Sequence, residues 1–217
     1  MKAEPRRRFV AIEGPPGAGV SALARALAAA VEARLVVDPA VMNPFRDDFA
    51  GDPRRWGFQS QIFCLLARWK QQSEIGQDDL FHPGGVVCDY TFGRDALYAA
   101  VTLPAEELAL YRRVHALLDG RLPRPDLVVY LTADKEILRS RIRRQVASSD
   151  RVIKLNVIDE LARAMDERFF AWEETPLLVI NTSELEAVEL PGQLEELIEL
   201  IGKTRAGVHH YRPMQTP

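Results

Sequence analysis

Short apolar runs alternate with longer segments of helical periodicity along most of the chain. The runs are typical of buried strands and lie at 9–13, 34–37, 85–88, 127–131 and 177–180. Between them the periodicity predicts helices over 21–31, 53–72, 106–118, 135–144, 156–172 and 190–201. Because strands that alternate with helices pair in parallel, the pattern predicts an α/β fold with a five-stranded parallel sheet and helices on both faces.

The predicted elements fit one domain. With 217 residues and 47% apolar composition, the chain can bury one substantial core, and its length favours a single domain over residues 1–205. The segment 206–217 contains Gly207 and two prolines and is predicted to be a flexible tail.

Charge and apolar run length argue against two classes of partner. A net charge of -3 gives no general attraction to nucleic acid or to an anionic membrane. No run approaches the roughly 20 apolar residues of a membrane span. Cys64 and Cys88 lie in apolar surroundings, which predicts buried free thiols in a reducing, cytoplasmic location.

The segment between the first strand and the first helix has the spacing of a phosphate-binding loop. The pattern is Gly, four residues, Gly, Lys, then Ser or Thr. Gly14, Gly17, Gly19 and Ser21 fit it, but Val20 stands at the lysine position. Glycines let the backbone approach an anion, and free N–H groups at a helix N-terminus attract it, so phosphate binding is predicted without the lysine. The alternative is an ordinary Gly/Pro turn.

Two aspartates directly follow predicted strands. Asp38 comes after the second strand and Asp89 after the third, at the edge where parallel sheets collect their ligands. The Ser21 hydroxyl and the Asp89 carboxylate suit Mg²⁺, which prefers oxygen ligands. The alternatives are a helix cap for Ser21 and a strand-end turn for Asp89.

Several longer stretches resemble the deoxynucleoside kinase family. They are Asn-Pro-Phe at 43–45, Gln61 with Arg68 seven residues later, 89–99, 124–131 with 139–142, and 175–182. The similarity spans roughly residues 8–182 and is strongest to deoxyadenosine and deoxyguanosine kinase-like P-loop proteins. It implies a P-loop nucleoside-kinase fold and transfer of the γ-phosphate of ATP to the 5′-hydroxyl of a deoxynucleoside.

The resemblance also implies roles for individual residues. Gln61 and Asp95 would bind the edge of the base, with Arg68 beside them, and an amide suits this task because it both donates and accepts. Asp38 would be the catalytic base, and Asp150 would contact the sugar. ATP and Mg²⁺ are the implied cofactors. The alternatives are a polar residue on an exposed helix face for Gln61 and a surface ion pair for Arg68.

The chain departs from the family pattern where phosphates would bind. The P-loop lysine is missing, and Gln145 and Ala147 replace the arginine pair of a lid at about residues 143–155. Asp38 and Asp150 each stand where relatives have glutamate. A shift in register would restore one charge from the flanking basic residues: Arg143, Arg144, Arg151 and Lys154.

These departures favour a pseudokinase, which would bind a nucleotide or nucleoside or serve as a scaffold for a protein partner. The alternative is an active ATP-dependent deoxynucleoside kinase with a substitute cation, such as Arg94, Arg141 or Arg144. A nucleoside monophosphate kinase, such as thymidylate kinase, shares the P-loop and lid but lacks the spacing of Gln61 and Arg68.

The resemblance also implies a homodimer paired through helices beside the sheet. A leucine-rich face of the helix at 106–118 could supply the contact, with core packing as the alternative use of the same side chains. These residues are Leu108, Leu110, Val114, Leu117 and Leu118.

Overall fold

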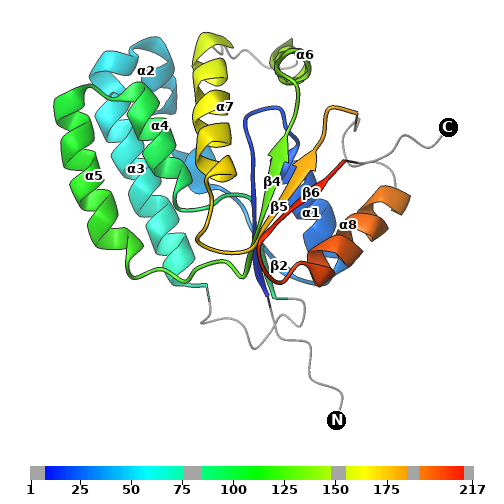
Figure 1. The fold of residues 1–217 in the computed structure, drawn as a ribbon. Coiled ribbons are helices and arrows are strands. Elements are labelled where there is room, and N and C mark those ends of the chain that lie inside the picture. The colour runs from blue at the N-terminus through cyan, green and yellow to red at the C-terminus, as the bar shows by residue number, and fades with distance from the viewer. Residues whose placement is uncertain (1–7, 76–84, 148–154, 185–190, 213–217) are drawn as a thin grey trace. The chain divides into compact units, whose positions relative to one another are not determined.

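The computed structural model describes residues 8–75, 85–147, 155–184 and 191–212. The chain divides into two compact units, drawn in Figure 1. The sheet unit comprises Met1–Val37, Asp78–Asp89 and Arg124–Pro217, and the helical unit comprises Asp38–Gln77 and Tyr90–Pro123. The single domain expected from chain length stays a prediction.

The sheet unit is built on six parallel strands in the order β2-β3-β1-β4-β5-β6. The strands are β1 Phe9–Glu13, β2 Arg34–Val36, β3 Val86–Cys88, β4 Leu127–Thr132, β5 Leu177–Asn181 and β6 Val208–Tyr211. Strands β1 and β3 are buried along their whole length, and β4 and β5 are buried except at their last residue. This burial explains their continuous apolar runs, because helices cover a parallel sheet on both faces.

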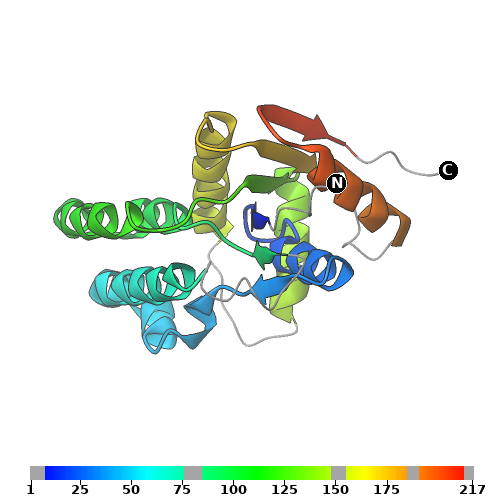
Figure 2. The ribbon, with the colours of Figure 1, turned by 90° about the horizontal axis from the view of Figure 1, so that it is seen from below.

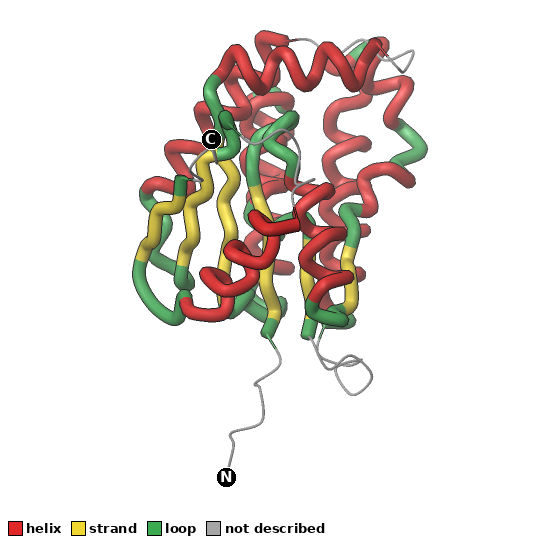
Figure 3. The backbone as a smooth tube through the Cα atoms, turned by 90° about the vertical axis from the view of Figure 1, so that its right-hand side faces the viewer, coloured by secondary structure: helices red, strands yellow, loops and turns green. Residues whose placement is uncertain are grey.

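Helices α1 and α8 cover one face of this sheet and α7 covers the other, as Figures 1 and 2 show. The helices of this unit are α1 Val20–Ala30, α6 Lys135–Ala147, α7 Leu155–Phe170 and α8 Pro191–Lys203. The tube in Figure 3 shows the strands side by side with helices packed on them. The prediction of a parallel sheet between helices is therefore confirmed.

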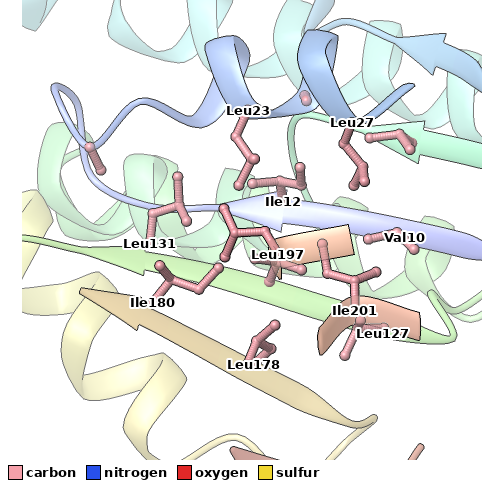
Figure 4. Packing of buried hydrophobic residues seen from close by; sticks show 14 of the residues in the cluster. Val10, Ile12, Leu23, Leu27, Leu127, Leu131, Leu178, Ile180, Leu197 and Ile201 are labelled. Atoms are coloured by element: carbon pink, nitrogen blue, oxygen red, sulfur yellow. The ribbon is translucent and has the colours of Figure 1, made fainter. Parts of the chain in front are cut away.

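The main core lies between the sheet and helices α1 and α8. Figure 4 shows alternate residues of the strands pointing into it and meeting leucines and an isoleucine of the two helices. The labelled members are Val10, Ile12, Leu23, Leu27, Leu127, Leu131, Leu178, Ile180, Leu197 and Ile201. All ten are buried, so this face of the sheet excludes water.

The opposite face is held by aromatic stacking and one hydrogen bond. The Tyr130 ring on β4 stacks on Phe169 of α7 with centroids 4.5 Å apart. The Tyr130 hydroxyl donates to Asp166 Oδ1 at 2.6 Å. Both residues on α7 therefore fix this helix against β4.

The helical unit packs three helices around its own apolar cluster. Its elements are η1 Pro39–Met42, α2 Arg46–Gly51, α3 Pro53–Ser73, α4 Arg94–Thr102 and α5 Ala105–Asp119. Asp52 caps α3 by accepting from the Arg55 N–H at 3.2 Å, and Pro53 starts the helix. The buried members of the cluster are Leu65, Phe92, Ala99, Leu103, Tyr111 and Leu122.

The leucine-rich face predicted at 106–118 serves mainly as core. Leu108, Val114 and Leu118 pack against the cluster of the helical unit. Leu110 and Leu117 instead remain 50% and 74% exposed. Only these two residues of the five are available on α5 for contact with another molecule.

The chain end differs from the sequence prediction of five strands and a flexible tail. Residues of β6 pair with β5 in parallel, with Leu177 opposite Val208 and Ile180 opposite Tyr211. Three of its four residues are exposed, and His209 and His210 interrupt any apolar run. Backbone pairing rather than side-chain burial makes this strand, which explains why the apolar pattern missed it.

Other short elements also lacked a periodic signal. The helices η1, α2 and α4 were not expected, since they are 4, 6 and 9 residues long. Cys64 and Cys88 are buried thiols that are not joined in a disulfide, as the sequence predicts. Within the part of the chain that the structure describes, no helix is both long and apolar enough to cross a membrane.

Two tyrosines test this account of packing. We expect Tyr130→Phe to lower the free energy of unfolding by about 1–3 kcal/mol, because it removes the hydrogen bond to Asp166. Tyr111→Phe should cost nothing or add up to about 1 kcal/mol, because its buried hydroxyl has no partner among the described residues. Urea unfolding followed by circular dichroism compares the pair. Equal losses in both variants would contradict the contrast.

Candidate functional site

Three glycines set the course of the loop that follows β1. Gly17 has φ 87° and Gly19 has φ 96°, which is left-handed backbone. A Cβ on Gly14 would lie 2.6 Å from the Leu131 carbonyl oxygen, and one on Gly17 would lie 2.9 Å from that of Leu138. No described residue lies within 4 Å of a Cβ on Gly19, so this side of the loop is open in the described part of the chain. The loop is therefore a tight backbone turn packed against β4 and α6.

The loop delivers the N-terminus of α1, which begins at Val20 with Gly19 as its N-cap. No side chain among the described residues caps this end. Such an end attracts anions through its free N–H groups and the helix dipole. The Val20 side chain is partly buried and packs against the main core, so it belongs to the packing of the sheet unit.

Arg141 of α6 braces the loop from the protein side. Its Nη2 donates to the Thr182 carbonyl at 2.7 Å and its Nη1 to the Gly17 carbonyl at 3.4 Å. The Thr182 hydroxyl in turn donates to the Ala18 carbonyl at 3.2 Å. Two carbonyls of the loop are thus held in place by side chains outside it. The guanidinium of Arg141 thus binds carbonyl oxygens. Arg144 lies exposed on the same helix.

Ser21 and Asp89 meet at the start of α1. The Ser21 hydroxyl donates to Asp89 Oδ2 at 2.8 Å, and Asp89 is buried. A hydroxyl and a carboxylate in contact are a donor set that fits Mg²⁺, which takes few protein ligands and completes its shell with water and phosphate oxygens. No group of three or more metal-binding acidic, histidine or cysteine side chains occurs among the described residues. A metal held mainly by protein side chains therefore has no site in the described part.

In the helical unit, Asp38 is surrounded by N–H donors. Its Oδ1 accepts from Arg68 Nε at 2.9 Å and from the Ala40 N–H at 2.9 Å. Its Oδ2 accepts from Arg68 Nη2 at 2.8 Å and from Arg94 Nη1 at 3.3 Å. Burial opposes the charge, but Arg68 and then Arg94 outweigh it and hold the pKa of this carboxyl below its usual range.

Arg68 joins Asp38 to a second, fully buried carboxylate. Its Nη1 donates to Asp95 Oδ1, and Arg68 and Asp95 are 4% and 0% exposed. Complete burial raises the pKa of Asp95 to about 6, although Arg68 draws it downward. Burial also works against the Arg68 cation, but the carboxylates of Asp95 and Asp38 together raise its pKa.

Buried polar atoms without partners gather in this unit. Asp95 Oδ2 and the Tyr111 hydroxyl have none among the described residues, nor do Trp69 Nε1, Gln72 Nε2 and Glu107 Oε2. Each such atom typically costs about 1–3 kcal/mol. All five lie on α3, α4 or α5. An unpaired carboxylate oxygen on a fully buried residue is a ready acceptor for a ligand donor.

The structure brings three of the four predicted nucleoside-binding residues, Gln61, Arg68 and Asp95, into one unit. Gln61 lies on α3 and is 6% exposed, and its Nε2 donates to Thr102 Oγ1 at 3.1 Å. It is thus buried, and Arg68 is part of a buried network, so neither occupies an exposed surface. Asp150 lies outside the described residues, as do the side chains of Gln145 and Ala147.

Sequence reasoning missed three partners of the site residues. Arg94 was considered only as a substitute phosphate cation, and Thr102 and Thr182 were not considered as partners. Arg94 directly precedes Asp95 at the start of α4, which is the one signal that could have drawn attention to it. The other two depend on contacts far apart in sequence, for which no local pattern exists.

Comparison with known sequences gives the family. The sequence model of the deoxynucleoside kinase family matches residues 10–204. This chain belongs to the deoxynucleoside kinase family. The resemblance predicted from residues 43–45, 89–99 and the spacing of Gln61 and Arg68 is thereby confirmed.

Curated relatives are distant, but each match covers most of the relative's length. Deoxyguanosine kinase of Bacillus subtilis (strain 168) is 29% identical over 153 residues, which is 70% of this chain and 74% of that protein. Deoxyadenosine kinase of Dictyostelium discoideum is 29% identical over 198 residues, or 88% of this chain and 77% of that protein. These relatives carry different base names, so membership alone does not assign a base to this family member.

Solved structures of this family share the fold. Deoxyadenosine kinase from M. mycoides with bound dATP matches with a TM-score of 0.75 and 21% identity, over 91% of this chain and 100% of that one. The same enzyme with bound dCTP matches with a TM-score of 0.71 and 21% identity, over 88% and 97%. The likeness confirms the nucleoside-kinase fold. The sheet of this chain has six strands instead of the five predicted from the sequence.

The loop geometry predicts the effect of one methyl group. We expect Gly17→Ala to lower the free energy of unfolding by about 1–3 kcal/mol, because φ is positive and the Leu138 carbonyl blocks the Cβ. Gly120→Ala is the control, since Gly120 has φ -64° and nothing within 4 Å; it should be neutral or gain up to about 1 kcal/mol. Thermal unfolding measures both, and equal stability of the two variants would refute the packed loop.

The raised pKa of Asp95 predicts a pH-dependent stability. Between about pH 4 and pH 6 the native state holds a proton on Asp95 that the unfolded state releases, so its contribution to the free energy of unfolding falls as pH rises. Relative to Asp95→Asn, the wild type should lose roughly 1–3 kcal/mol across this window and then level off. Urea unfolding at pH 4.5, 5.5 and 7 measures this. Asp47→Asn, an exposed change in the same unit, is the control, and parallel curves for wild type and Asp95→Asn would contradict it.

Proposed function

We propose that this chain binds a deoxynucleoside through its helical unit and an ATP–magnesium complex through its glycine loop, and that it transfers the γ-phosphate to the 5′-hydroxyl slowly. The observation that carries the proposal is the network of Asp38, Arg68 and Asp95, in which Arg68 and Asp95 are buried. The reaction class is inferred from family membership, and the slow rate is inferred from the residue at position 20.

A buried ion network with an unpaired oxygen favours a ligand. Burying charges costs several kcal/mol per ion unless partners compensate, and Asp95 Oδ2 has no partner in the described part of the chain. A base amino group could donate to it, while the Gln61 amide offers both a donor and an acceptor nearby on α3. A pure scaffold would gain nothing from these costs, so we infer that nucleoside binding is retained.

The glycine loop supports phosphate binding by backbone groups. The open side at Gly19 and the uncapped N-terminus of α1 offer N–H donors, and Arg141 and Thr182 hold the loop carbonyls. Ser21 and Asp89 would hold Mg²⁺, which when bound neutralises charge on the phosphate oxygens. These residues would orient the nucleotide, and none of them obstructs its binding.

We expect slow transfer because position 20 has no positive charge. Phosphoryl transfer depends on cations that meet developing charge, and Val20 supplies packing in place of a cation. Arg141 is tied to loop carbonyls, so its substitution for the lysine would require breaking those bonds. Loss of one preorganised charge or donor typically costs about 10²- to 10³-fold in rate.

A second candidate is a binding protein without transfer. The observation that favours it is the Asp38 carboxylate, which already accepts at least four N–H bonds and so offers no vacant position to a hydroxyl proton. In this reading a protein partner or a second copy would give the bound state its role. Leu110 and Leu117, exposed on α5, are the apolar residues that such a contact would use.

The deciding experiment compares binding with turnover. We expect isothermal titration calorimetry to detect a purine or pyrimidine deoxynucleoside, and Asp95→Asn to weaken that binding at least roughly 10-fold because an amide alters the charge that Arg68 pairs with. ATP- and magnesium-dependent phosphorylation should be barely measurable in the wild type and rise roughly 10²-fold in Val20→Lys.

Val208→Lys is the matched control, because Val208 is 51% exposed on β6 and far in sequence from the loop. It should leave binding and turnover unchanged. Turnover of roughly 1–100 per second by the wild type would overturn slow transfer. Undetectable binding of every deoxynucleoside would overturn the proposed function, and binding with no turnover in either protein would favour the second candidate.

A further inference from the structure

The lone pairs of Asp38 are already in use. A carboxylate has about four acceptor positions, and Asp38 fills them with Arg68 Nε and Nη2, Arg94 Nη1 and the Ala40 N–H. A hydroxyl group that donates to this carboxylate must therefore displace a donor that is already bound. The question is which of the three residues gives way.

Arg68 and Ala40 are poorly placed to leave. Arg68 binds both oxygens of Asp38 at 2.9 and 2.8 Å, and it is fixed at its other end by fully buried Asp95. The Ala40 N–H belongs to η1, where Asp38 is the N-cap, so its bond is part of the local backbone. Releasing either one would disrupt the ion network or unfold a turn.

Arg94 is the donor that can leave. Its Nη1 donates to Asp38 Oδ2 at 3.3 Å, which is longer than the three other contacts named above. Its side chain is 11% exposed, against 5% for Arg68. Its Cζ also lies 5.9 Å from the centroid of the Tyr98 ring, one helical turn along α4, so the cation retains an aromatic partner when it leaves Asp38.

We propose that Arg94 is a latch on Asp38: it occupies the acceptor position on Oδ2 that the 5′-hydroxyl of a bound deoxynucleoside needs, and it must swing away before that hydroxyl can donate there. The inference rests on the proposed function, since it takes a deoxynucleoside as the ligand. It makes Arg94 a positioning residue that acts through Asp38.

The latch affects recognition of the hydroxyl. With Arg94 in place, gaining the hydroxyl bond costs the ion-pair bond to Arg94, and the two nearly cancel. Without Arg94, the hydroxyl meets an open acceptor on a charged group, and such a bond is worth roughly 10-fold or more in affinity. Removal of the latch should therefore create a preference for ligands that carry a 5′-hydroxyl.

The test compares binding of 2′-deoxynucleosides with their 2′,5′-dideoxy analogues, which lack the hydroxyl. Titration calorimetry with the adenine, guanine and cytosine pairs should show less than roughly 3-fold discrimination in the wild type. Arg94→Met keeps an unbranched apolar stem but removes the donors, and it should bind the hydroxyl form roughly 10-fold more tightly than the analogue. Arg94→Lys, which restores one donor, should return the discrimination toward the wild-type value. Arg112→Met, an exposed change on α5, should match the wild type.

Equal discrimination in the wild type and Arg94→Met would overturn the latch while leaving nucleoside binding intact. Absence of binding to both members of every pair would instead overturn the proposed function, and the latch with it. The two failures are thus distinct.

A ligand-free measurement tests the contact itself. The charged groups known to act on Asp38 among the described residues include Arg68 from α3 and Arg94 and Asp95 from α4. Carbon-13 NMR titration of the Asp38 carboxyl should show a higher pKa in Arg94→Met than in the wild type, because one cation is lost, and no change in Arg112→Met. If Arg94→Met does not fold, Arg94→Leu, which also lacks a donor and a charge, carries both tests. An unchanged Asp38 titration in a folded variant would show that Arg94 does not hold this carboxylate and would overturn the latch.

Discussion

One guanidinium group organises the helical unit. Arg68 binds Asp38 with two nitrogens and Asp95 with the third, so a single side chain on α3 ties the residue that opens η1 to the first turn of α4. A planar fork with five donors is the only side chain that can satisfy two carboxylates in this way, and lysine could not replace it. The direction of this fork explains why Asp38 is surrounded by donors and why Asp95 Oδ2 has no partner among the described residues.

The glycine loop of the sheet unit keeps its shape independently of its charge. Positive φ angles at Gly17 and Gly19 and the close approach of Gly14 to β4 give the loop its form. Arg141 and Thr182 hold its carbonyls from outside. The residue that would bring the cation, Val20, contributes to the core instead. The turn can therefore persist when the charge is lost, because different residues encode each property.

The sequence allowed the strands and long helices to be located because their signals are local. Continuous apolar runs marked β1, β4 and β5, and α3 was expected to begin at Pro53 after the capping Asp52. Spacing and resemblance placed Gln61, Arg68 and Asp95 in one group, and the structure has all three in the helical unit. The contact of Arg94 with Asp38, the brace of Arg141 on Gly17 and the bond of Gln61 to Thr102 join residues 41 to 124 positions apart. No periodicity reports such pairs.

The short strand β6 protects the edge of the sheet from pairing with other protein molecules. Residues Leu177–Asn181 of β5 are almost wholly apolar, and their outer edge would be a template for pairing with other chains. β6 covers that edge with four residues, two of which are histidines, and three of the four are exposed. A polar, four-residue strand is a poor partner for further β-pairing. Strand β6 therefore helps to keep the protein from aggregating, because it replaces an apolar strand edge with a solvent-exposed one.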